Sequence, residues 1–333
     1  MDHQKNALKM GAAAIAFAIF LRLFGSAVTV ARGIFQDPQI LSFAVFLQTG
    51  RAVRYPYAAT VPTQPQAPTE QVPEVTTPAP ALPVFSPTDL ETLSLIYGCD
   101  YRPDLEALLL TSLNWDLQDG QPAVLIVHTH GTEAYTPTAD ALYEASGDYR
   151  TLDENYNMIS IGDEVARVLE NNGIAVIHDR SCHDEPSYNG SYLSARKSIE
   201  AYLQAYPSIR LVLDIHRDAV TKENGQQLTT SATVGGQASS QIMLVIGTDA
   251  SGNHHPNWQQ NLSLALKLTA QLERENPGIT RPIYLRSERF NMDLTPGSLL
   301  VEVGASGDTH NQAILAANAL ANAIAALSKG TLQ

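Results

Sequence analysis

Short apolar runs alternate with amphipathic stretches from Asp89 to the end of the chain, and this alternation limits the possible folds more than any other feature. The predicted strands are 123–127, 175–177, 211–215, 242–246 and 299–303, and the predicted helices are 158–172, 192–205, 258–275 and 312–327. Strands and helices that alternate at this spacing predict an α/β protein with a mostly parallel sheet covered by helices on both faces. The polar stretch 225–240 is expected to be an insertion or a hairpin loop, and 90–113 to be one or two helices beside the sheet or part of a small preceding subdomain.

The chain divides into four parts. Residues 1–32 are predicted to be a membrane anchor or signal segment, 33–87 a juxtamembrane segment and Pro/Thr-rich linker, 88–122 a helical lead-in, and 123–330 the α/β domain. The linker has too few large apolar residues to fold and is expected to be an extended spacer.

The first part has two interpretations. Counted through Arg22 its apolar run can span a bilayer, and counted only to Leu21 it resembles the core of a cleaved signal peptide. The basic residues Lys5 and Lys9 favour a retained single-pass anchor with the N-terminus inside. Either interpretation predicts a domain outside the cytoplasm.

Composition restricts the partners and the type of metal site. The chain has 21 Lys and Arg against 34 Asp and Glu, a formal net charge of −13, which argues against a nucleic-acid partner. Cys99 and Cys182 are the only two cysteines, too few for a disulfide framework or a cysteine-rich zinc site. A metal site in this chain must therefore use His, Asp and Glu.

Three predicted strands end in side chains that can bind a metal. His128 and His130 follow the first strand, His216 lies at the end of the third, and Glu302 lies within the last. Parallel strands would bring His130, His216 and Glu302 to one edge of the sheet, where two imidazoles and carboxylates can hold Zn²⁺ with a position open for water. The alternative for either histidine alone is a hydrogen-bonded structural role. His128 and His130 are two residues apart, so an extended chain would place them on one side.

Five segments resemble the motifs of one known family, in the family's order. These segments are His128–Tyr135, Asp214–Ala219, Pro256–Asn261, Phe290–Leu294 and Leu300–Gly304. They resemble the signature of the stage II sporulation protein P family, and the resemblance covers about 123–327. It implies a fold similar to zinc-dependent N-acetylmuramoyl-L-alanine amidases (phosphorylase/hydrolase-like), and a wall hydrolase with amidase and endopeptidase activity. It also implies a role in septal thinning and engulfment during sporulation, with stage II sporulation proteins D and M as partners at the sporulation septum.

The resemblance also implies roles for individual residues. His130 and His216 match the metal-binding histidines, and Glu302 matches the catalytic glutamate. The third ligand is expected to be Glu133, within the first motif, with Glu154 as the alternative because it precedes a helix as in the amidases.

The remaining site residues are expected around this centre. Arg217 is predicted to stabilise an oxyanion or hold a peptide carboxylate, with an ion pair to Asp218 or another acid as the alternative. His128 is expected either to support a metal ligand or to contact substrate rather than to bind the metal itself. Asn291 and Trp258 are predicted to contact substrate, and a core role for Trp258 is equally open. Two other functions compete: another zinc-dependent wall peptidase or deacetylase, and a wall-binding scaffold without activity.

Overall fold

The computed structural model describes residues 83–332, apart from 115, 147–148 and 329–330. The predicted segment 1–32 and most of the predicted linker 33–87 lie outside the described residues. Within the part of the chain that is described, no helix is both long enough and apolar enough to cross a membrane.

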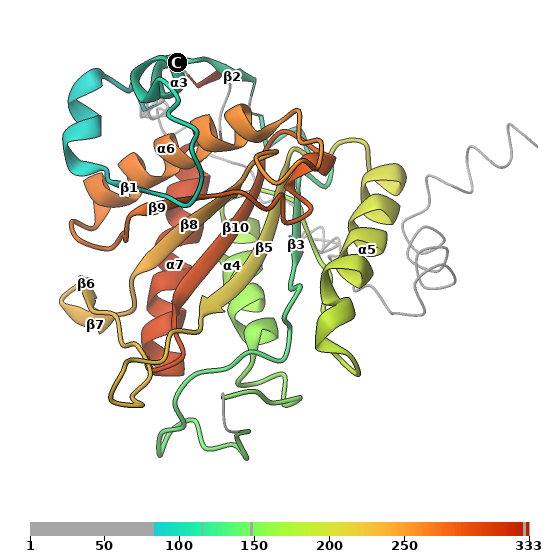
Figure 1. The fold of residues 1–333 in the computed structure, drawn as a ribbon, viewed down its shortest axis with the longest axis vertical. Helices are drawn as coiled ribbons and strands as arrows, with labels where there is room; N and C mark the ends of the chain where they lie inside the picture. The colour runs from blue at the N-terminus through green and yellow to red at the C-terminus, as the bar shows by residue number, and fades with distance from the viewer. Residues whose placement is uncertain (1–82, 115, 147–148, 329–330, 333) are drawn as a thin grey trace, which may run out of the picture. The chain divides into compact units, whose positions relative to one another are not determined.

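A seven-stranded sheet forms the centre of the fold (Figure 1), in the order β1-β9-β8-β10-β5-β3-β4. Its strands are β1 (Leu95–Tyr97), β3 (Val124–Val127), β4 (Val176–His178), β5 (Leu211–Asp218), β8 (Ile242–Gly247), β9 (Ile283–Arg286) and β10 (Ser298–Ala305). Strands β4, β3, β5 and β10 run parallel, and so do β8, β9 and β1, but β8 is antiparallel to β10. The prediction of a mostly parallel sheet is confirmed, with one antiparallel junction at β8 and β10.

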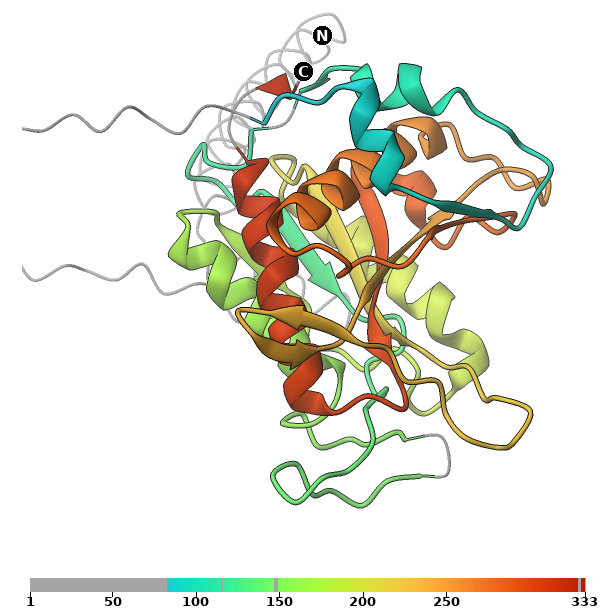
Figure 2. The same ribbon diagram turned by 90° about the vertical axis from the view of Figure 1, so that its left-hand side faces the viewer.

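Helices cover both faces of this sheet. They are α4 (Met158–Asn171), α5 (Ser191–Ala205), α6 (Trp258–Glu275) and α7 (His310–Ala326). Helix α7 packs against both α4 and α6, while α5 lies across the sheet from α4 and α7 (Figure 2). Helix α4 connects β3 to β4, at the edge of the sheet, and α5 connects β4 back to β5. Because these two connections run in opposite directions across the sheet and both are right-handed, their helices lie on opposite faces. Among the described residues, α5 is therefore the only long helix on the second face.

Helix α4 shows how local sequence sets these boundaries. The Asn157 side chain accepts a hydrogen bond from the Ile159 amide at 3.0 Å, so it caps the first turn. The helix buries Ile161, Val165 and Leu169 on one face, and Gly173 follows its end with a φ of +79°. The predicted helices are confirmed to within about two residues at each end.

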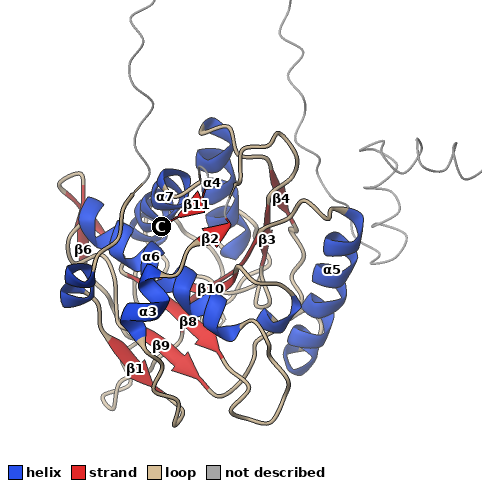
Figure 3. Cartoon of the chain, turned by 90° about the horizontal axis from the view of Figure 1, so that it is seen from above, coloured by secondary structure: helices blue, strands red, loops and turns tan. Residues whose placement is uncertain are grey.

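The lead-in contributes two strands as well as an α-helix and a 3₁₀ turn. It contains the 3₁₀ turn η1 (Pro87–Thr92), β1, helix α3 (Leu105–Leu110) and the short strand β2 (Leu113–Asn114), which pairs with β11 (Thr331–Leu332). Figure 3 shows α3 beside α6. Ser263 of α6 donates to the Leu108 carbonyl at 2.6 Å, and Lys267 donates to that of Leu109. Side chains of α6 thus satisfy carbonyls that the end of α3 leaves without helical partners.

The hairpin agrees with the prediction, whereas two strands differ from it in length. The polar stretch 225–240 contains the hairpin of β6 (Ala232–Val234) and β7 (Gln237–Ser239), as expected. Strands β5 and β10 are longer than predicted because their polar residues continue the strand past the apolar run.

Candidate metal centre

His216 and Glu302 occupy neighbouring positions on parallel strands. They are register partners in β5 and β10, so their side chains lie on the same face of the sheet. The register shifts between Glu302 and Ala305, where Gly304 has a φ of +74°. A Cβ at Gly304 would lie 2.6 Å from Oδ2 of Asp308, so only glycine fits at this position, two residues after Glu302.

The turn after β3 brings two more ligating side chains to His216. Nδ1 of His130 lies 3.5 Å from Oε1 of Glu133, and Nδ1 of His216 lies 3.6 Å from Oε2 of the same carboxylate. All three residues are buried, and their ligand atoms lie within 4.8 Å of one another. Ligands of tetrahedral zinc at roughly 2.1 Å stand about 3.4 Å apart. The separations in this cluster are therefore suitable for Zn²⁺.

Charge in the cluster is balanced around Glu133. Burial opposes ionisation of this carboxyl, but Arg217 and the two histidines hold its pKa well below its usual range. Burial also opposes protonation of His216, while the carboxylates of Asp214 and Glu133 raise its pKa well above the ordinary value. The environment therefore keeps Glu133 anionic, the form that binds a cation.

Glu302 differs from Glu133 in its surroundings. Its Oε2 is buried and has no hydrogen-bond partner among the described residues. Burial raises the pKa of Glu302 to about 8, against the lowering effect of His216. A carboxyl with one unpartnered oxygen beside a candidate metal cluster is suited to accept and return a proton.

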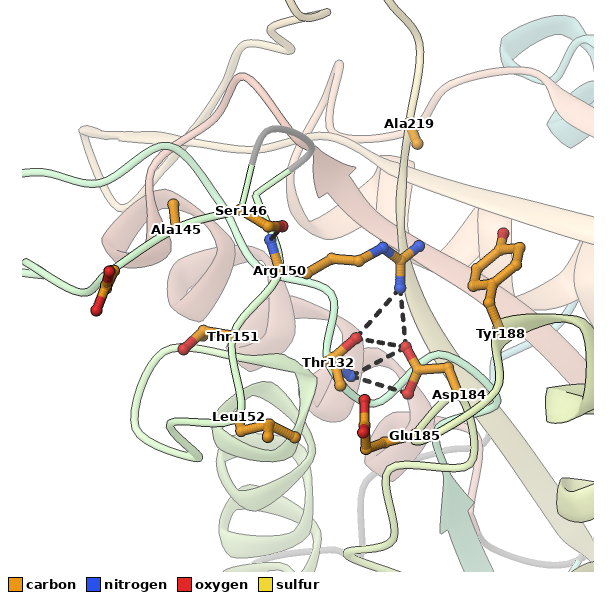
Figure 4. Close-up of a pocket in the computed structure, with 11 residues that line it drawn as sticks. Thr132, Ala145, Ser146, Arg150, Thr151, Leu152, Asp184, Glu185, Tyr188 and Ala219 are labelled. Atoms are coloured by element: carbon orange, nitrogen blue, oxygen red, sulfur yellow. Dashed lines mark hydrogen bonds and ion pairs between the residues drawn. The ribbon is translucent and has the colours of Figure 1, made fainter.

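A pocket of about 840 Å³ opens beside the cluster (Figure 4). Arg150 lies within it, with Nη1 2.8 Å from Oδ2 of Asp184 and Nη2 3.2 Å from Oε1 of Glu133. Tyr188, also in the pocket wall, stacks on the His130 imidazole with ring centroids 4.5 Å apart. Thr132 completes the connection because it lines the pocket and directly precedes Glu133. The pocket therefore borders the cluster through Arg150 and Tyr188.

The structure places His128 on the other face of the sheet. Val127 pairs with Asp214, so alternation directs His128 away from the face that carries Asp214 and His216. His128 is fully buried, donates from Nδ1 to the Ile215 carbonyl at 3.1 Å, and pairs with His178 at 2.8 Å. Burial and the neighbouring His178 lower its pKa to about 3. The predicted shared side with His130 does not form, because the chain leaves the strand at Val127 and turns.

Arg217 is enclosed by protein. Its side chain has no exposed surface; it donates to the Ala134 carbonyl at 2.8 Å and lies 3.4 Å from Glu133. The guanidinium facing the pocket is instead that of Arg150, 19% exposed. Arg217 therefore holds the segment of the first motif through Ala134 and Glu133. Of the two predicted roles, the structure shows the ion pair with an acid, and the contact with substrate stays a prediction.

The remaining predicted residues lie at different distances from the cluster. Asn291 donates to the Tyr192 carbonyl at 2.8 Å, and the Tyr192 ring lies edge-on to His130 with centroids 5.6 Å apart. Trp258 stacks on Tyr101. It follows β8, which runs antiparallel to β10, so β8 ends at the edge of the sheet opposite to the one that carries the cluster. Glu154 is half-exposed and pairs with Arg180 at 2.6 Å. Of the two glutamates expected as the third ligand, Glu133 is the one beside the histidines.

Sequence reasoning missed several residues of the site. Asp214 contacts His216, and its position two residues before that histidine in a strand was the available signal. Arg150, Asp184 and Tyr188 come from long connecting segments, and no local pattern marks them. Their contribution depends on how these segments fold over the sheet.

The fold and the cluster define an α/β protein with a buried site able to hold a divalent metal ion. The chain belongs to the Stage II sporulation protein P family, whose model matches residues 62–325. Stage II sporulation protein P of Bacillus subtilis (strain 168) is 27% identical over 210 residues, which cover 60% of this chain and 49% of that protein. The chain thus matches about half the length of this curated relative.

Similar solved structures include two amidases. N-acetylmuramoyl-L-alanine amidase AmiC2 of Nostoc punctiforme is 16% identical, with 63% of this chain and 96% of that chain covered and a TM-score of 0.37. The CwlD amidase of Clostridioides difficile, solved in complex with the GerS lipoprotein, is 13% identical, with 61% and 96% covered and a TM-score of 0.38.

Proposed function

We propose that this protein is a zinc-dependent peptidoglycan hydrolase of sporulation that cleaves the amide between muramic acid and the stem peptide. The observation that carries the proposal is the convergence of His130, Glu133 and His216 beside Glu302 on the neighbouring strand. Family membership supports a role in sporulation. An additional endopeptidase activity is part of the proposal, because the same centre suits any amide placed against it.

Each residue of the centre has a distinct task. His130, Glu133 and His216 would hold the metal ion. Bound Zn²⁺ supplies a Lewis acid and lowers the pKa of a coordinated water toward 7. Glu302 accepts the proton of the attacking water through its unpaired oxygen and returns it to the departing amine. The pocket that contains Arg150 and Tyr188 receives the part of the substrate next to the scissile amide.

The rest of the chain would place this centre at the wall. Residues 1–32 are proposed to anchor the protein in the membrane, with 33–87 as a tether and the 123–330 domain outside the cytoplasm at the sporulation septum. Stage II sporulation proteins D and M are the proposed partners in septal thinning and engulfment.

The test combines metal analysis with product analysis. Purified full-length protein should contain zinc and release stem peptides from muramic acid, and a chelator should abolish the release. Glu302→Gln should keep zinc and lose about 10²- to 10⁴-fold in rate, the range for a general base. Glu91→Gln makes the same change at an exposed position and should remain active.

The products separate the competing functions. Free lactyl carboxyl groups on muramic acid with intact stem peptides identify an amidase, and cleaved stem peptides identify a peptidase. Released acetate with free amino groups on the glycan sugars identifies a deacetylase. Unimpaired hydrolysis by the Glu302→Gln variant would refute the mechanism. A protein that binds peptidoglycan without cleaving it would indicate a scaffold.

A further inference from the structure

Asp214 is a buried carboxylate within the apolar strand β5. It is 5% exposed, and it lies two residues before His216, so both side chains are on the same face of the sheet. A carboxylate in such a position is costly unless it is paired. Its partners therefore indicate what it does.

Those partners belong to the two segments that carry the histidines. Oδ1 of Asp214 accepts from the Thr129 amide at 2.8 Å, and Oδ2 accepts from the Thr129 hydroxyl at 2.6 Å. Nε2 of His216 lies 2.9 Å from Oδ1, a close ion pair rather than an aligned hydrogen bond. Thr129 directly precedes His130, so one carboxylate connects the turn that carries His130 to the ring of His216.

The contact also determines which nitrogen of His216 faces the cluster. Nε2 lies 2.9 Å from Oδ1 of Asp214, and Nδ1 lies on the side of Glu133, 3.6 Å from Oε2. A carboxylate on the second nitrogen of a ligating imidazole fixes the orientation of the ring and increases its basicity.

We propose that Asp214 is a positioning residue, which holds His216 with Nδ1 toward Glu133 and fixes the turn of His130, and thereby sets the zinc affinity of the site. The inference rests on the proposed zinc centre. Asp214 acts through the two histidines and does not itself bind the metal ion.

The test measures zinc binding, which is independent of catalysis. Full-length protein, stripped with a chelator, is titrated with Zn²⁺ in competition with a chromogenic chelator. Asp214→Asn preserves the size of the side chain but removes its charge, and it should raise the zinc Kd about 10- to 100-fold, as loss of such a partner does. Asp163→Asn, the matched control, changes a carboxylate that pairs with His178 and should leave the zinc Kd unchanged.

A second pair of variants, at Thr129, tests the same role if Asp214→Asn does not fold. Thr129→Val removes the hydroxyl that holds Oδ2 and keeps the backbone amide, whereas Thr129→Ser keeps both donors. Thr129→Val should weaken zinc binding about threefold or more, and Thr129→Ser should bind as the unsubstituted protein does. The visible spectrum of the Co²⁺-loaded protein, which reports ligand geometry, should change in Asp214→Asn and Thr129→Val only.

The outcomes separate this inference from the proposed function. Equal zinc affinity and an unchanged Co²⁺ spectrum in Asp214→Asn would overturn the role of Asp214 while leaving the zinc centre intact. If Asp214→Asn cannot be purified folded, unchanged affinity in Thr129→Val would overturn it. Failure of the unsubstituted protein to bind zinc would refute the zinc centre itself.

Discussion

The phenol ring of Tyr188 lies parallel to the imidazole of His130, with centroids 4.5 Å apart and an angle of 16° between the planes. Tyr188 is 53% exposed and lines the pocket, whereas His130 is buried beneath it. The Arg150 guanidinium also lies over the Tyr188 ring, 4.8 Å from its centroid. Tyr188 thus forms a surface between the metal-binding cluster and the pocket, where a substrate would contact it.

This arrangement predicts that Tyr188→Ala weakens substrate binding more than it slows the chemical step. Loss of an aromatic contact worth about 0.5–1.5 kcal/mol should raise KM roughly 2- to 13-fold on soluble muropeptides, with a smaller change in kcat. Tyr188→Phe retains the ring and serves as the control, so it should stay close to the unsubstituted protein. A kcat loss with unchanged KM in Tyr188→Ala would contradict a substrate-contacting role.

Gly162 lies so close to two histidines on the opposite face of the sheet that a larger side chain should destabilise the protein. A Cβ at this position of α4 would lie 2.5 Å from Nε2 of His128 and 2.5 Å from Nε2 of His178. Gly162→Ala should therefore lower the free energy of unfolding by about 1–3 kcal/mol, because the overlap outweighs the roughly 1 kcal/mol gain in helix propensity. Urea unfolding monitored by circular dichroism measures the change.

The control for this substitution is Gly190→Ala. A Cβ at Gly190 would have its nearest neighbour, Oγ of Ser187, at 3.8 Å, which is an ordinary contact. This variant should keep its unfolding midpoint within the error of the measurement. Equal midpoints for Gly162→Ala and the unsubstituted protein would show that the histidine pair moves aside.

Substitution of the buried Arg217 should lower the stability of the protein rather than specifically impair catalysis. Arg217→Lys retains the charge but removes the planar fork that reaches the Ala134 carbonyl and the Glu133 carboxylate. Disruption of a buried pair of this kind costs about 3–5 kcal/mol. Thermal unfolding of the metal-free protein should show a clear fall in Tm.

Arg167→Lys provides the comparison at an exposed arginine, where the side chain is 55% accessible. It should change the free energy of unfolding by less than about 0.5 kcal/mol. If Arg217→Lys keeps the original Tm but loses activity, the predicted contact of Arg217 with substrate is restored.

The sequence was sufficient to predict the strands that carry the site, because β5 and β10 have continuous apolar runs before their polar residues. Strand β9 was missed because only alternate residues of Ile283–Arg286 are buried, which gives no apolar run. The reversal at β8 depends on pairing between residues far apart in the chain, and no local pattern encodes it. The predicted placement of His216 and Glu302 on neighbouring parallel strands is therefore confirmed by their register.

The positions of the other site residues depend on turns and loops, which the sequence pattern does not specify. The alternation rule failed for His128 and His130 because it applies only while the chain stays extended, and the strand ends at Val127. Arg217 was expected to face substrate from its place beside His216, but neighbours on a strand point to opposite faces. Arg217 therefore starts from the face of β5 opposite His216, and Arg150 reaches the pocket from a connecting segment.

Titration of the buried Lys267 should make the free energy of unfolding depend on pH. It is fully buried on α6, donates to the Leu109 carbonyl and lies with Nζ 5.0 Å from the Phe85 ring centroid. Burial lowers its pKa from the ordinary 10.5 to about 8. Between these values the unfolded chain retains a proton that the folded protein has lost, so this group makes the free energy of unfolding rise with pH from about 8 to 10.5.

Lys267→Met removes this titration, while every other group remains. The free energy of unfolding of the unsubstituted protein minus that of Lys267→Met should therefore be constant below about pH 8 and increase as the pH rises toward 10.5. Urea unfolding at pH 7.5, 9 and 10 on both proteins gives this difference directly, because shared titrations cancel. A difference that stays constant or falls over this range would show that Lys267 keeps its proton in the folded protein.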